Sequence, residues 1–86
     1  MASVAEVKAA IGAAMQYVQE GQAAVLAANT KLGEAQQSLA AAVEGSGHES
    51  VAAAQAALAQ AAGDLEECLA ATLGAMERAQ QYAAAL

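Results

Sequence analysis

Large apolar residues recur every seven positions along the first half of the chain. Six follow one another without a break: Val4, Ile11, Val18, Val25, Leu32 and Leu39. Three residues after each comes a second and mostly small row: Val7, Ala14, Gly21, Ala28, Ala35 and Ala42. Alternating steps of three and four residues keep both rows on one face of an α-helix. The pattern predicts a long helix with a coiled-coil seam, in which one row is large and the other small.

The predicted first helix covers residues 4–44. Ser3 and Glu6 have the spacing of a capping box, in which the serine oxygen accepts from the amide of the glutamate. After the helix, the segment 45–48 contains two glycines and a serine. Gly45 suits the left-handed residue that often follows a helix end. We therefore expect a short turn there.

A second helix is predicted over residues 49–85. Ser46 and Glu49 repeat the capping-box spacing, and Ser50 is another candidate cap. The stripe of this helix has a row at Val51, Leu58, Leu65 and Thr72, interleaved with Ala54, Ala61, Cys68 and Ala75. A short turn makes the two helices antiparallel. Residues 1–86 are thus predicted to form one all-α domain, a two-helix hairpin.

The rows that face each other form the predicted intrachain seam. Its residues are Val18, Val25, Ala28, Leu32, Ala35, Leu39, Val51, Leu58, Ala61, Leu65 and Cys68. In the expected register Leu32 meets Ala61 and Val25 meets Cys68, so that a large residue faces a small one in nearly every layer. This alternation lets the helix axes approach to about 8 Å.

A second apolar edge on residues 49–85 lies beside this seam and predicts a partner. It comprises Ala62, Leu69, Leu73 and Met76. A two-helix hairpin cannot cover both edges, and exposed apolar patches mark interaction sites. A second copy of the chain would close a four-helix bundle. The sequence therefore predicts a homodimer, and the alternative is pairing with another helical protein.

Composition narrows the class of partner. Of the 86 residues, 29 are alanine, so the hydrophobic fraction of 58% reflects helix propensity more than large apolar surface. The formal charge of -6 disfavours nucleic acid and anionic membranes as partners. The chain has no long apolar run and no recognisable secretory signal. We expect a protein that is cytoplasmic, or exported without a cleaved Sec signal.

Residues for catalysis or metal binding are sparse. His48 is the only histidine and Cys68 the only cysteine, so a closed nitrogen or sulfur metal site cannot be assembled within one chain. Cys68 is expected to act as a small apolar residue of the seam, with an intermolecular disulfide or a reactive thiol as alternatives. No motif for a cofactor is found. We expect no enzyme, no catalytic residues, no metal and no cofactor.

The hairpin with a glycine turn at mid-chain resembles the WXG100 class of small helical proteins, which are substrates or partners of type VII secretion. That family has Trp-x-Gly at the turn, where this chain has Glu44 followed by Gly-Ser-Gly, and an export signal Tyr-x-x-x-Asp/Glu, where this chain has Tyr82 and Leu86. The chain is also similar to small alanine-rich hairpins of actinobacteria. The second resemblance implies an adaptor or interaction module, and the first a secreted helical protein or its heterodimeric partner.

Overall fold

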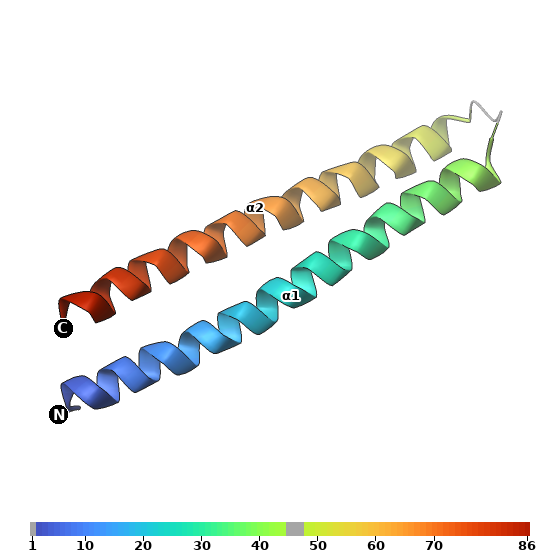
Figure 1. Cartoon of the computed structure of the whole chain (residues 1–86). Coiled ribbons are helices and arrows are strands. Elements are labelled where there is room, and N and C mark those ends of the chain that lie inside the picture. Colours follow the sequence, from blue (N-terminus) through green and yellow to red (C-terminus); the bar gives the residue numbers. More distant parts are fainter. Residues whose placement is uncertain (1, 45–47) are drawn as a thin grey trace.

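The chain forms a hairpin of two long α-helices (Figure 1). The computed structural model describes residues 2–44 and 48–86. Helix α1 covers Val4–Ala42 and helix α2 covers Glu49–Ala85. The molecule measures 64 × 17 × 15 Å, close to the length of about 58 Å that 39 helical residues span at about 1.5 Å each. No strand is present in the two described segments, so the predicted all-helical hairpin is confirmed.

The start of α1 agrees with the sequence signal. Ser3 is the N-cap, and its Oγ accepts a hydrogen bond of 3.1 Å from the amide of Glu6. At the other end, α1 stops at Ala42, two residues before the predicted limit. The amide of Val43 donates to the Leu39 carbonyl at 3.2 Å and closes the last turn. The roles predicted for Gly45 and Ser46 lie outside the described residues.

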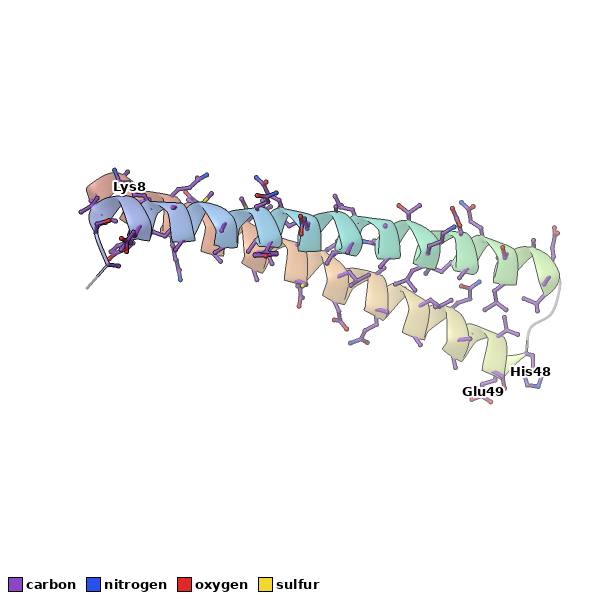
Figure 2. All side chains as sticks on the ribbon, turned by 90° about the horizontal axis from the view of Figure 1, so that it is seen from below. Lys8, His48 and Glu49 are labelled. Carbon is purple, nitrogen blue, oxygen red and sulfur yellow. The ribbon has the colours of Figure 1, made fainter. Side chains whose placement is uncertain are left out.

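Helix α2 begins at a residue that sequence reasoning did not consider as a cap. His48 occupies the N-cap position with extended backbone angles, and its Nδ1 accepts a hydrogen bond of 3.1 Å from the amide of Ser50. Figure 2 shows His48 and Glu49 together where the turn enters α2, at the opposite end of the hairpin from Lys8. The imidazole thus takes the place that serine or aspartate usually fills at a helix start.

One row of the predicted seam lies where α1 and α2 meet. Ile11, Val18, Val25, Leu32 and Leu39 of α1 are half-buried. In α2 the row at Val51, Leu58, Leu65 and Thr72 is half-buried as well, and so is Ala79 one heptad later. No described residue is fully buried, because each helix covers only one side of the other. The seam is therefore a partly wet contact.

The prediction that the second, mostly small row lies in the contact between the helices is wrong. Ala14, Gly21, Ala28, Ala35 and Ala42 are exposed, and so are Ala54, Cys68 and Ala75 of α2. Of the small residues expected to interleave with the large row, only Val7 and Ala61 are half-buried. The contact stripe instead takes up the residues four positions after each member of the large row. These are Met15, Gln22, Asn29, Gln36 and Val43, and in α2 Gln55, Ala62, Leu69, Met76 and Ala83.

The predicted and the observed contact stripes differ in the side chains that they bury. Residues three and four positions along a helix both neighbour the starting residue, so the large row is compatible with either stripe. The observed stripe places Leu69 and Met76 in contact where the predicted one offered Cys68 and Ala75. Each additional buried methylene contributes about 0.8 kcal/mol, and glutamine stems also cover apolar surface. The helices therefore turn toward the larger side chains.

Two glutamines form hydrogen bonds across the seam. Gln22 Nε2 donates to Thr72 Oγ1 at 3.1 Å and lies 3.4 Å from Met76 Sδ. Gln55 Nε2 donates to the backbone carbonyl of Gln36 at 3.0 Å. The residue numbers add up to 94 for Gln22 and Thr72 and to 91 for Gln36 and Gln55, so these long side chains reach along the seam and set the register to within about one helical turn.

The residues that α2 offers to the large row differ in part from those expected. Leu69 lies in the contact stripe where Cys68 was expected, whereas Ala61 is half-buried as predicted, with Ala62 beside it. The seam contains glutamine, asparagine and threonine between its apolar layers, and none of their described buried polar atoms lacks a hydrogen-bond partner.

Candidate interaction surface

The predicted dimer patch is largely used within the hairpin. Ala62, Leu69 and Met76 are half-buried members of the contact stripe between α1 and α2. The prediction that these three residues form an edge separate from the seam is therefore wrong. Leu73 differs from them, because its side chain is 55% exposed. It is the one residue of the predicted patch that projects to solvent.

A second leucine lies on the same flank of the hairpin as Leu73. Leu26 of α1 is also 55% exposed. In α1, Leu26 comes one turn after Gln22 and lies beside the row that contains Gln22. In α2, Leu73 comes one turn after Leu69 and lies beside the row that contains Leu69 and Met76. The contact between Gln22 and Met76 shows that these two rows meet on one side. We call this flank, defined by Leu26 and Leu73, the leucine edge.

The distance between the two leucines along the hairpin is short. Leu26 lies level with residue 68 when the pairing of Gln22 with Thr72 is continued along both helices, and with residue 65 when the pairing of Gln36 with Gln55 is continued. Leu73 is thus five to eight residues further along α2, which corresponds to about 7.5 to 12 Å along the axis. The leucines therefore form one patch, supplied by both helices. Sequence reasoning missed Leu26, although a large apolar residue directly after the heptad position of Val25 was the available signal.

The opposite flank carries the small residues that were predicted for the seam. We call it the alanine edge, and its exposed members are Ala14, Gly21, Ala28, Ala35, Ala42, Ala54, Cys68 and Ala75. Cys68 is a free thiol on this exposed edge. The expectation that it packs in the seam opposite Val25 is therefore wrong. Residues 68 and 73 differ by about 140° around α2, which separates the thiol from the leucine edge.

Charged side chains occupy the outer faces of both helices. Lys31 and Glu34 form an ion pair of 3.1 Å with side chains 79% and 57% exposed. Exposed pairs of this kind add less than about 1 kcal/mol. The other acidic residues are also exposed wherever the chain is described. At the leucine edge, Glu66 lies two helical turns before Leu73 and Glu77 lies one turn after it.

The described residues do not bring metal-ligating side chains together. No group of three histidine, cysteine, aspartate or glutamate side chains comes together among them. A shallow depression on the outer face of α1 is lined by Ala13, Gln16, Tyr17 and Glu20. Ligand sites are concave and enclose most of the ligand, whereas Tyr17 beside this depression is 74% exposed. The depression lacks the enclosure and the converging polar groups of such a site.

Neither described helix is long and apolar enough to cross a membrane. Comparisons with protein families, with curated proteins and with solved structures gave no match for this chain.

Proposed function

We propose that the protein is a non-enzymatic protein–protein interaction module, which works as a homodimeric bundle of helices. The observation that carries this proposal is the surface that the single hairpin leaves in contact with water. The chain exposes 6047 Å². A compact folded protein of 8.4 kDa exposes about 4,600 Å². The hairpin thus exposes about 1,400 Å² more than a compact protein of its mass.

This excess of exposed area is comparable to the area that a protein buries when it associates with a partner. A standard protein interface buries about 800 Å² on each partner, and interfaces of obligate homodimers are often larger. Domains this small rarely form a sufficient core alone and frequently gain it by oligomerisation. A hairpin in which no described residue is fully buried fits this description. Pairing of two hairpins would supply the missing burial.

Thermal unfolding of the purified chain at several protein concentrations tests the proposal. If folding is coupled to dimerisation, the helical signal in circular dichroism melts cooperatively and the Tm rises with concentration, because mass action favours the folded dimer. A cooperative melt with a Tm independent of concentration would contradict it.

The second candidate is a type VII-like secreted helical protein, or the heterodimeric partner of one. The paired antiparallel helices of 39 and 37 residues favour it. In that case the chain alone would be poorly helical and would gain helix on addition of a different helical chain. The same circular dichroism experiment separates the two functions, because only the homodimer is helical and cooperative by itself.

A further inference from the structure

We propose that a second copy of this chain binds across the leucine edge, so that Leu26 and Leu73 of two hairpins form the centre of the interface. This inference rests on the proposed function and names the surface that performs it. Both leucines are more than half exposed in the single hairpin. They come from different helices, so a partner that covers both also holds the two helices together.

The leucine edge carries two large aliphatic side chains. The alanine edge presents mainly methyl groups and glycines, together with Cys68 and, one heptad after Ala75, Tyr82, which is 57% exposed and carries a polar hydroxyl. The outer faces carry most of the charged side chains, whose removal from water is costly. At the leucine edge, two large apolar side chains adjoin the half-buried Leu69 and Met76. Covering this flank therefore extends the existing seam into a continuous core.

Area favours a second copy as the occupant, and charge argues against a basic partner. A basic partner would be selected by acidic groups, and most of these lie on the outer faces, with Glu66 on the leucine edge and Glu77 one turn after Leu73. A copy of the chain, which also carries a formal charge of -6, meets fewer carboxylates on this flank than on the outer faces. The excess of about 1,400 Å² per chain matches an interface with one partner of similar size. A twofold axis would then place leucines of one copy against leucines of the other.

Cross-linking tests the position of the interface. Chains with Cys68→Ser and either Leu26→Cys or Leu73→Cys are treated, separately and mixed, with a short bismaleimide. We expect covalent dimers, because the new thiols lie at the centre of the interface. The matched control, Cys68→Ser with Tyr17→Cys, places the thiol on the outer face and should give no more than a tenth of that yield. Equal yields from the control and the edge variants would overturn the proposal.

Charge substitutions provide an independent test. Leu26→Glu and Leu73→Glu should each weaken dimerisation at least tenfold in sedimentation, whereas Tyr17→Glu should leave it unchanged. If both edge variants remained dimeric like the unmodified chain, the leucine edge would be the wrong surface although the homodimer would stand. If the unmodified chain were a folded monomer, the proposed function would fail first. Where a glutamate variant does not fold, Leu73→Ala replaces it, with a smaller loss of dimer expected.

Discussion

At the scale of single residues, the polar side chains of the seam determine which residues of α1 and α2 lie opposite one another. Gln22 is half-buried and donates to Thr72 at 3.1 Å. A buried polar group is costly unless it is hydrogen-bonded, so a slip of the helices that separates this pair is disfavoured. Such groups can fix a register at some cost in stability. Gln22 and Gln55 are therefore the side chains that limit how far the two helices can slip along one another.

A double-mutant cycle tests the pair. Gln22→Ala and Thr72→Ala should each lower the free energy of unfolding, and the two losses should be coupled by about 0.5 to 1.5 kcal/mol because they remove the same hydrogen bond. The measurement is chemical unfolding followed by circular dichroism. Gln19→Ala, at an exposed position of the same helix, combined with Thr72→Ala serves as the uncoupled control. Coupling of zero for the first pair would refute the hydrogen bond between Gln22 and Thr72.

Cys68 provides a second test at this scale. Its thiol is exposed on the alanine edge, away from the seam and from the proposed interface. We expect a maleimide or a disulfide reagent to modify the native protein at a rate within about tenfold of that of the urea-unfolded chain, since access controls thiol reactivity. Protection by a factor of a thousand would instead place Cys68 in a buried contact, as the heptad pattern had suggested.

At the scale of the helices, the sequence was sufficient to predict the hairpin but not the rotation of each helix about its own axis. The cap at Ser3, the glycine turn and the uninterrupted row from Ile11 to Leu39 specify two helices and one shared line of contact. They do not specify which second row of residues joins the contact, because the positions three and four residues further along the helix both satisfy the same seven-residue repeat. That choice depends on comparing pairs of side chains across both helices.

The same ambiguity explains the misplaced dimer patch. Leu69 and Met76 were assigned to an outer edge because Cys68 and Ala75 were assigned to the seam, and a one-position change exchanges the two sets. Leu26 was missed because it belongs to neither row. The role of His48 was missed for a different reason, since histidine is not among the preferred residues at a helix N-cap.

Substitution of His48 tests its role at the start of α2. His48→Ala removes the Nδ1 acceptor and should lower the free energy of unfolding by about 0.5 to 2 kcal/mol, whereas His48→Asp supplies another acceptor and should retain stability. Urea unfolding of the three proteins under the same conditions gives the comparison. A loss in the aspartate variant as large as in the alanine variant would argue against capping by this side chain.

The helical glycines test whether anything approaches the helices closely. A Cβ built at Gly12, Gly21 or Gly63 meets nothing within 4 Å. Replacement by alanine should therefore stabilise the protein by about 0.5 to 1 kcal/mol at each site, since alanine is the better helix former. The Tm of each variant measures this. Gly21 is the most informative site, because it lies on the alanine edge, and a loss of dimer in Gly21→Ala would indicate that the second copy packs there.

At the scale of the whole molecule, the hairpin is long, narrow and incompletely buried. It measures 64 Å by about a quarter of that length in the other directions, and no described residue is fully buried. Helical stability in proteins comes mostly from packing of an apolar face. A single seam between two alanine-rich helices provides little packing of this kind. A second copy that covers the leucine edge, as we propose, would supply the missing packing.

Net charge predicts how this association responds to salt. Two chains that each carry a formal charge of -6 repel one another, and added salt screens that repulsion. Raising NaCl from about 0.1 to 1 M shortens the Debye length from about 10 to 3 Å and should tighten the dimer. Sedimentation at both salt concentrations measures the change. A dimer held together by opposite charges would show the opposite dependence, so weakening of self-association by salt would contradict an apolar interface at the leucine edge.

The most direct test of the central claim is the mass of the protein in solution. Sedimentation equilibrium of the unmodified chain over a wide range of concentrations should give a mass of twice 8.4 kDa at the upper end, with helical circular dichroism increasing as the dimer forms. A fully helical, cooperatively folded species that stays at 8.4 kDa at every concentration would contradict the account.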